Sequence, residues 1–114
     1  MKILYSTPEL TMKERYDLTR NPNTENMRDH VGETLAVDQY MVREEARGDT
    51  GELVQIVSIK SGDKFIATNS IVFCKEFTSI LEMCSASGEN VNHIEVTTGH
   101  SKKGREFITC VYID

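Results

Sequence analysis

The fold is decided by residues 52–84, ELVQIVSIKSGDKFIATNSIVFCKEFTSILEMC. Two runs rich in β-branched and apolar residues, 52–60 and 64–69, flank a Ser-Gly-Asp segment that is typical of a tight hairpin. Asn69 or Ser70 can cap a helix, and apolar residues then recur at three- and four-residue spacing, at Phe73, Phe77, Ile80, Leu81 and Cys84. The stretch therefore predicts two hairpin-linked strands followed by one amphipathic helix.

Outside this stretch the sequence predicts three more strands. Residues 34–46, TLAVDQYMVREEA, alternate in polarity and shift phase once between Val37 and Tyr40, as a bulge in a long, bent strand requires. Residues 91–98 and 106–113 also alternate, and they are joined by GHSKKGR, residues 99–105. Three strands, a helix and two strands is the order of the OB-fold. We therefore expect a mainly β (α+β) domain, a five-stranded barrel with the helix between its third and fourth strands.

Residues 1–32 are predicted to form a helical extension in front of the barrel domain, which spans residues 33–114. Thr11 and Glu14 have the spacing of a capping box, in which each side chain satisfies a backbone N–H at the start of a helix. The helix MKERYDLTR follows and stops before Pro22, which disfavours helical geometry at the preceding residue. A second short helix is expected over residues 25–31. Because apolar residues are sparse in both helices, each has to dock on another element.

Length and composition bound the class of protein. The 114 residues suit one domain with its own core, and 39% hydrophobic with 27% charged residues is an ordinary globular composition. No apolar run approaches the roughly 20 residues of a membrane helix, and the segment MKILYSTPEL lacks the features of a secretion signal. Cys74, Cys84 and Cys110 form no CxxC pair, which argues against a disulfide framework or a zinc site. We therefore expect a protein of the reducing cytoplasm with no membrane partner.

The net charge of −5 argues against a nucleic-acid partner, but the charge is segregated along the chain. Residues 33–59 hold six acidic side chains against two basic ones, Arg43 and Arg47, and so carry most of the excess. The segment 99–105 instead holds Lys102, Lys103 and Arg105 and no acidic residue. The acidity therefore predicts weak, salt-sensitive binding by several protomers side by side, and it does not exclude nucleic acid.

The cations and the aromatic residues fall where an OB-fold binds nucleic acid. That fold binds over its second and third strands, flanked by the loops that join strands one to two and four to five. Such a groove combines cations for the phosphate backbone with aromatic platforms worth about 1–3 kcal/mol per stacked base. The expected backbone contacts are Lys102, Lys103 and Arg105, supported by Lys60, Lys64 and Arg43. The expected stacking residues are Tyr40, Phe65 and Tyr112, although core packing fits the alternation equally well for Phe65 and for the fourth strand aromatic, Phe107.

No constellation of residues indicates catalysis, a metal ion or a cofactor. His93, Glu95, His100 and Cys110 have no recognised ligand spacing. The chain also holds no nucleophile-elbow motif and no glycine-rich phosphate loop. The sequence therefore favours a binding module that is not an enzyme.

Three segments of the chain resemble a known family: GETLAVDQYMV (32–42), FIATNSIVFCKEF (65–77) and GHSKKGREFITCVYI (99–113). They make residues 31–114 similar to small single-stranded-DNA-binding proteins encoded by phages and mobile elements of Gram-positive bacteria. The resemblance implies an OB-like fold that coats transient single strands during replication or recombination, without sequence preference, in the cytoplasm of a host cell. Replication or recombination proteins are then expected partners beside the DNA, and a homo-oligomer is the expected assembly.

The main alternative is a protein-interaction module with no nucleic-acid role, such as a phage factor that captures a host protein. The acidic stretch 44–52 would then meet a basic surface of the partner. In this case the segment 99–105 is an ordinary solvated turn. A second alternative is an assembly role, in which the N-terminal helices dock on a neighbouring chain.

Overall fold

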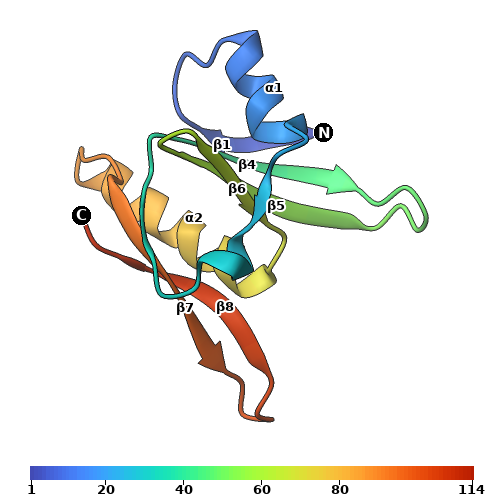
Figure 1. The fold of residues 1–114 in the computed structure, drawn as a ribbon, viewed down its shortest axis with the longest axis vertical. Coiled ribbons are helices and arrows are strands. Elements are labelled where there is room, and N and C mark those ends of the chain that lie inside the picture. The colour runs from blue at the N-terminus through green and yellow to red at the C-terminus, as the bar shows by residue number, and fades with distance from the viewer.

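Two β-sheets and two α-helices make up the computed structural model, which describes residues 1–114 (Figure 1). The larger sheet has five strands, in the order β1 (Lys2–Ser6), β4 (Gln39–Ala46), β5 (Leu53–Ser61), β6 (Lys64–Thr68) and β2 (Glu25–Asn26). The smaller sheet has three, in the order β3 (Thr34–Ala36), β7 (His93–His100) and β8 (Glu106–Tyr112). The helices are α1 (Met12–Arg20), α2 (Ile71–Ala86) and the short 3-10 helix η1 (Met27–His30). The chain is thus a mixed α+β protein built mainly from strands, as the sequence predicts.

The stretch 52–84 folds as predicted. β5 and β6 form an antiparallel hairpin whose turn contains Gly62 at φ +63°. α2 begins after Ser70, whose side-chain oxygen accepts a hydrogen bond from the Phe73 N–H at 3.3 Å. The predicted apolar face of α2 is buried, at Phe73, Phe77, Ile80, Leu81 and Cys84. α2 is the longest helix, and no helix of the chain is long and apolar enough to cross a membrane.

The strand predicted over residues 34–46 is divided between the two sheets. Its first part, β3, pairs with β7, whereas its second part, β4, pairs with β5. At the junction, the Val37 N–H donates to the Asn92 carbonyl oxygen at 2.8 Å and the Asp38 N–H donates to the Lys60 carbonyl oxygen at 2.9 Å. The predicted change of phase is therefore a crossing from one sheet to the other, and not a bulge within one ladder.

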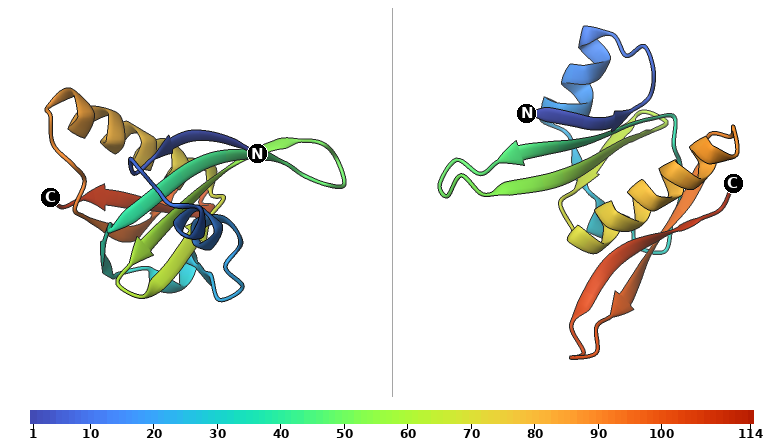
Figure 2. Two further views of the ribbon diagram at one scale, coloured as in Figure 1. Left: turned by 90° about the horizontal axis from the view of Figure 1, so that it is seen from above. Right: turned by 180° about the vertical axis from the view of Figure 1, so that it is seen from behind.

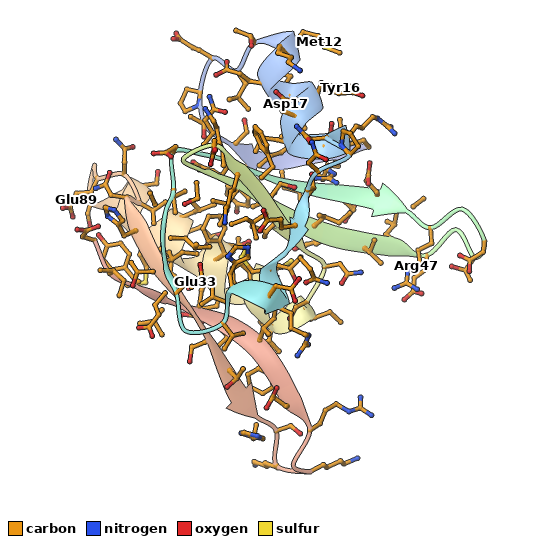
Figure 3. All side chains as sticks on the ribbon, in the orientation of Figure 1. Met12, Tyr16, Asp17, Glu33, Arg47 and Glu89 are labelled. Carbon is orange, nitrogen blue, oxygen red and sulfur yellow. The ribbon has the colours of Figure 1, made fainter.

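The two sheets are not closed into the predicted five-stranded barrel. No ladder joins β6 to β8, although a hydrogen bond from Ser70 Oγ to the Ile108 carbonyl oxygen, at 3.3 Å, links the end of β6 to β8. The β4–β5 and β7–β8 pairs extend from the body as two ribbons in different directions (Figure 1, Figure 2). Arg47 lies at the outer end of the first ribbon (Figure 3). We name residues 44–52 of this ribbon the acidic arm.

The N-terminal 32 residues are only partly helical. α1 forms at the predicted capping box: the Thr11 N–H donates to Glu14 Oε1 at 2.8 Å, and the Glu14 N–H donates to Thr11 Oγ1 at 3.2 Å. The short helix predicted over residues 25–31 is confirmed in part: Met27–His30 form the 3-10 helix η1, whereas Glu25–Asn26 form β2, which pairs with β6. β1, which the sequence pattern did not predict, pairs with β4. The N-terminal segment therefore supplies both edge strands of the larger sheet.

Side chains pack into two cores of unequal size. The main core of 18 buried residues lies between the two sheets and includes the apolar face of α2. The second core consists of Leu10, Leu18 and Met41, with Phe65 packed against it. This small core fixes α1 on the face of the larger sheet that is turned away from α2.

Candidate nucleic-acid interface

Residues 99–105, here named the cationic hairpin, form the outer end of the β7–β8 ribbon (Figure 1). The Ser101 N–H donates to the Arg105 carbonyl oxygen at 2.9 Å, and the Arg105 N–H donates to Ser101 Oγ at 3.2 Å, which closes the turn. Gly104 adopts φ +80°, a conformation that glycine reaches without strain. Lys102, Lys103 and Arg105 are exposed, and none of them forms a salt bridge. The turn therefore carries three free cations.

An aromatic ring lies beside these cations on the outer face of the smaller sheet, the face turned away from α2. Phe107 pairs with Gly99, and a Cβ atom at Gly99 would lie only 2.6 Å from Phe107 Cε1. The ring therefore rests against the backbone of β7. It stays half-exposed because its strand neighbours Ile108 and Cys110 are the residues that point into the core. Phe107 is not among the binding residues expected from the sequence; the signal for it is the glycine directly across the hairpin.

α1 covers the outer face of β5 and β6, where the OB-fold interpretation places the main nucleic-acid groove. Phe65 is half-buried on this face and packs against the core formed by Leu18, Leu10 and Met41. Phe65 therefore takes part in packing α1 on the sheet, and its role as a platform for bases stays a prediction. The helix occupies the surface on which a base would stack.

Lys60 and Lys64 flank the turn between β5 and β6. This turn and the cationic hairpin lie at opposite ends of the molecule (Figure 1). Lys60 is half-buried beside α1. The pKa of Glu14 on α1 is lowered, mainly by the hydrogen bond from the Thr11 backbone N–H and also by the charge of Lys60. Lys60 therefore stabilises the carboxylate of Glu14. Of the two lysines at this turn, only Lys64 is exposed.

Arg43 is buried, with an exposed fraction of 5%. Its Nη1 donates to Ser58 Oγ at 2.8 Å and to the Leu18 carbonyl oxygen at 3.3 Å, and its Nε lies 3.5 Å from Glu45 Oε2. The guanidinium thereby ties the last turn of α1 to the larger sheet. A side chain in this position does not reach a phosphate backbone, so the contact expected for Arg43 is not formed by this structure.

The two tyrosines expected to stack bases lie apart from each other and from the cations. Tyr40 is half-buried and meets Phe77 of α2 edge-on, with the ring centroids 5.9 Å apart. Burial raises the pKa of the Tyr40 hydroxyl. Tyr112 is exposed, but it lines a small hollow with Ile80 and Met83 of α2, at the end of β8 opposite the cationic hairpin. Neither ring lies next to a free cation.

Of the residues expected to bind nucleic acid, the structure brings together Lys102, Lys103 and Arg105. It adds Phe107 to them. At the base of the hairpin, the carboxylate of Glu106 lies 3.9 Å from the guanidinium of Arg28 and 3.8 Å from Nε2 of His100. The arrangement can bind a polyanion with its three cations and stack one flat ring on Phe107.

No group of three or more His, Cys, Asp and Glu side chains is placed to hold a metal ion. All three cysteines are free and buried. Burial raises the pKa of the Cys74 thiol to about 11 and that of the Cys110 thiol to about 12. Both thiols are therefore protonated at neutral pH, and the thiolate is the form that reacts.

Comparisons with known proteins found no relative of this chain. No family model, no curated protein and no solved structure matches the chain. The resemblance to single-stranded-DNA-binding proteins therefore stays a prediction, and a function has to be inferred from the chemistry of the cationic hairpin and Phe107.

Proposed function

We propose that the protein is a non-catalytic binding module for single-stranded DNA, which it holds through the cationic hairpin and Phe107. The observation that carries the proposal is the placement of Lys102, Lys103 and Arg105, free of salt bridges, beside a half-exposed aromatic ring. Lysine and arginine bind the phosphate backbone, and the ring offers a face to one unpaired base. Because none of these contacts reads the edge of a base, binding is largely independent of sequence.

An open OB-like fold is the second part of the proposal. Its support is the pairing of residues 34–46, which contribute β3 to one sheet and β4 to the other and so lie beside both β7 and β5. α2 then follows β6, and the β7–β8 pair comes last. The OB-fold is itself a partly open five-stranded barrel, and the loop between its last two strands is one of the two loops that flank its binding face. In this chain that loop is the cationic hairpin.

The charge distribution supports binding that depends strongly on salt. The net charge of −5 repels DNA at long range, but the hairpin carries its cations away from the body of the molecule. At about 0.15 M salt the Debye length is about 8 Å, so carboxylates farther away than this are largely screened. Three contacts to a single-stranded backbone give a slope of about −2 when the logarithm of the binding constant is plotted against that of the salt concentration.

A fluorescence-anisotropy titration with labelled oligo-dT tests the proposal, run beside a duplex of the same length at two salt concentrations. We expect the single strand to bind more tightly than the duplex. Replacing Lys102, Lys103 and Arg105 together with alanine should weaken binding at low salt on the order of tenfold or more and flatten its salt dependence. Phe107→Leu should weaken binding by about 1–3 kcal/mol and leave the salt slope unchanged, because it removes stacking and no charge.

A matched control removes cations that lie outside the proposed interface. The double variant Lys13→Ala/Lys64→Ala loses two exposed charges, one on α1 and one on β6. It should keep the affinity for oligo-dT within about threefold, since scattered surface charges act weakly through salt. No binding by the intact protein at low salt, or equal losses in the control and in the hairpin variant, would sink the proposal.

Protein binding without a nucleic-acid role is the second candidate function. The observation that favours it is the position of α1, which covers the outer face of β5 and β6 and removes the usual OB-fold groove from solvent. The same titration separates the two candidates. Absence of oligo-dT binding by the intact protein at low salt would favour protein binding, whereas oligo-dT binding that persists in Phe107→Leu and in the hairpin triple variant would place the DNA contact outside the hairpin.

A further inference from the structure

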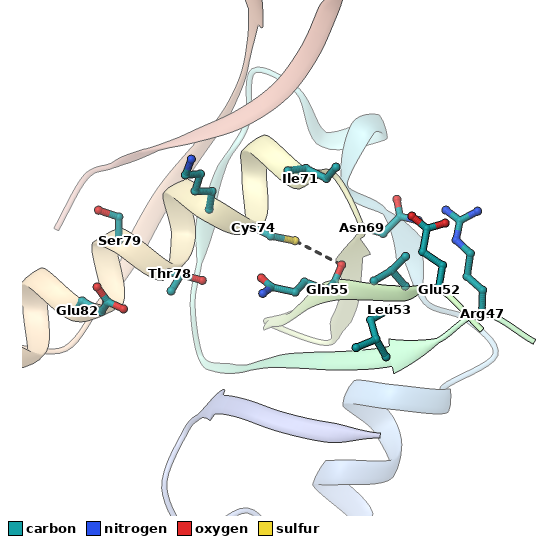
Figure 4. A pocket seen from close by; sticks show the side chains of 12 residues that line it. Arg47, Glu52, Leu53, Gln55, Asn69, Ile71, Cys74, Thr78, Ser79 and Glu82 are labelled. Carbon is teal, nitrogen blue, oxygen red and sulfur yellow. Dashed lines mark hydrogen bonds between the residues drawn. The ribbon is translucent and has the colours of Figure 1, made fainter. Parts of the chain in front are cut away.

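A groove of about 700 Å³ lies between the end of the larger sheet and α2 (Figure 4). One wall comes from β5, at Leu53 and Gln55, and the other from α2, at Ile71 and Thr78. Leu53 is 62% exposed and Ile71 is 83% exposed, so both present apolar surface to water. The Thr78 hydroxyl is buried in the wall and has no hydrogen-bond partner. Exposed apolar side chains on both walls indicate a surface that another molecule completes.

The backbone of β5 has no strand neighbour along this groove, where the Gln55 carbonyl oxygen accepts a hydrogen bond from Cys74 Sγ at 3.6 Å (Figure 4). β6 pairs only with residues 57–61 of β5, so residues 53–56 have β4 on one side and no strand on the other. A free strand edge offers its N–H and C=O groups to an added strand and binds it by main-chain hydrogen bonds. The occupant that fits the groove is therefore an extended strand or a ribbon.

An acidic segment lies beside the groove. The acidic arm, residues 44–52, carries four carboxylates against the single cation Arg47. Asp49 and Glu52 are exposed and form no salt bridge, and Glu52 lines the groove itself. Among the residues that line the groove, the cations Arg47 and Lys75 balance the carboxylates Glu52 and Glu82. The excess of negative charge that favours a cationic occupant lies on the acidic arm.

The chain itself carries a ribbon with these properties. The cationic hairpin holds three free cations, and β3 pairs only with residues 93–95 of β7, so residues 97–100 lack a strand neighbour on the side away from β8. The hairpin and the acidic arm project in different directions (Figure 1, Figure 2). A chain therefore does not place its hairpin in its own groove.

We propose that this groove binds the cationic hairpin of a second copy of the chain. Asp49 and Glu52 of one copy face Lys102 and Lys103 of the next, and the free edge of β5 pairs with the free edge of β7. Because the groove and the hairpin are different surfaces, the contact is heterologous: it repeats head to tail and builds an open chain of copies unless the rotation closes a ring.

The proposal does not rest on DNA binding, although both use the same hairpin. It is tested on protein freed of nucleic acid, by sedimentation velocity over a range of protein and salt concentrations. We expect the mean mass to rise with protein concentration at low salt and to fall to that of the monomer at about 0.5 M salt, where the Debye length is only a few ångströms. The variants Asp49→Asn/Glu52→Gln and Lys102→Ser/Lys103→Ser should each raise the dissociation constant on the order of tenfold.

Mixing the two variants gives the decisive measurement. The groove variant keeps an intact hairpin, and the hairpin variant keeps an intact groove. Each of them alone should remain monomeric at a concentration where the unaltered chain associates. An equimolar mixture should form a one-to-one dimer and nothing larger, because only one productive contact is left in each pair. A matched control, Glu9→Gln/Lys13→Ser, changes two charges near α1 and should associate like the unaltered chain.

Three outcomes would overturn the proposal. The first is an unaltered chain that stays monomeric at low salt and millimolar concentration. The second is association that both variants retain in full. The third is a mixture of the two variants that remains monomeric, which would show that groove and hairpin do not recognise each other. Binding of oligo-dT by the same samples is measured separately, so failure of this contact and failure of the proposed function are told apart.

Discussion

Phe107 lies across the β7–β8 ribbon from Gly99, so closely that a Cβ atom at position 99 would come within 2.6 Å of Phe107 Cε1. Real Cβ atoms do not approach a ring carbon to this distance, so a side chain at position 99 has to displace the ring. The glycine thus seats the aromatic ring on the outer face of the smaller sheet, next to the cationic hairpin. The absence of a side chain at Gly99 thus sets the position of the ring that we propose to bind a base.

The first prediction concerns this pair. Gly99→Ala should lower the free energy of unfolding by about 1 kcal/mol, because the ring is pushed off its seat. The same substitution in a Phe107→Ala background should have almost no further effect, since the clash has gone with the ring. Urea unfolding of the two single variants and the double variant measures the coupling. Strictly additive losses would show that the two residues do not act on each other.

The second prediction concerns Arg43, which the sequence pattern placed among the DNA-binding cations. Arg43→Ala should lower the free energy of unfolding by about 3 kcal/mol, because it leaves Ser58 Oγ and the Leu18 carbonyl oxygen without their donor in a buried place. The affinity of the remaining folded protein for oligo-dT should not change. Lys64→Ala, at an exposed cation of β6, is the control and should stay within about 0.5 kcal/mol of the unaltered chain. A loss of DNA affinity in folded Arg43→Ala would contradict the structural role.

Local patterns in the sequence predict the elements whose contacts are local. The capping box of Thr11 and Glu14 and the helical spacing of Phe73, Phe77 and Ile80 need no distant partner, and both are confirmed. The helix expected over residues 25–31 is shorter than predicted, a 3-10 turn over Met27–His30, because the residues before it pair with a distant strand. β2 takes its hydrogen bonds from β6.

In the candidate site, too, the sequence predicts what depends on local contacts and misses what depends on distant ones. The cationic hairpin is a local turn, and the sequence shows it directly. The exposure of Phe65 depends instead on where α1 docks on the larger sheet. Leu10 and Leu18, in a segment with few apolar residues, determine that position by packing in the small core. The position of the Phe107 ring on the outer face of the smaller sheet depends on the register of β7 and β8, which pairs Phe107 with Gly99. Neither the docking of a helix nor a register is encoded in the spacing of single residues.

The third prediction concerns the cysteines. Because burial raises the pKa of the Cys74 and Cys110 thiols to about 11 and about 12, neither should react with a chromogenic disulfide reagent at neutral pH in the folded protein. In denaturing urea all three cysteines should react rapidly, since the chain has no disulfide. Absorbance measurements, by stopped flow where the reaction is fast, give the reaction rates in the folded chain and in urea. Rapid release of one equivalent from the folded chain, traced by mass spectrometry to Cys74 or Cys110, would contradict the packing of α2 against β8.

The last prediction follows from His30, which is 4% exposed and lies between two carboxylates. Its Nε2 is 2.7 Å from Glu25 Oε1 and its Nδ1 is 3.0 Å from Glu33 Oε1. Burial lowers the pKa of His30, but the hydrogen bonds to Glu33 and Glu25 outweigh it, so the pKa rises above its ordinary value of 6.5. Only the protonated ring donates to both carboxylates at once, and the bond to Glu25 helps to hold β2 at the edge of the larger sheet.

A histidine with a raised pKa in the folded state stabilises the fold fully below its unfolded pKa, and this contribution disappears as the pH rises through the folded value. The free energy of unfolding should therefore fall as the pH rises from 6.5 through the raised pKa of the folded state, by roughly 1.4 kcal/mol for each pH unit that separates the two pKa values. His30→Gln should be less stable at the lower pH and lose this dependence. His93→Gln, at the exposed ring 2.6 Å from Asp114 Oδ1, is the matched control and should retain it. Parallel pH profiles for the unaltered chain and His30→Gln, measured by urea unfolding, would show that His30 is neutral and that the carboxylates do not hold a cation between them.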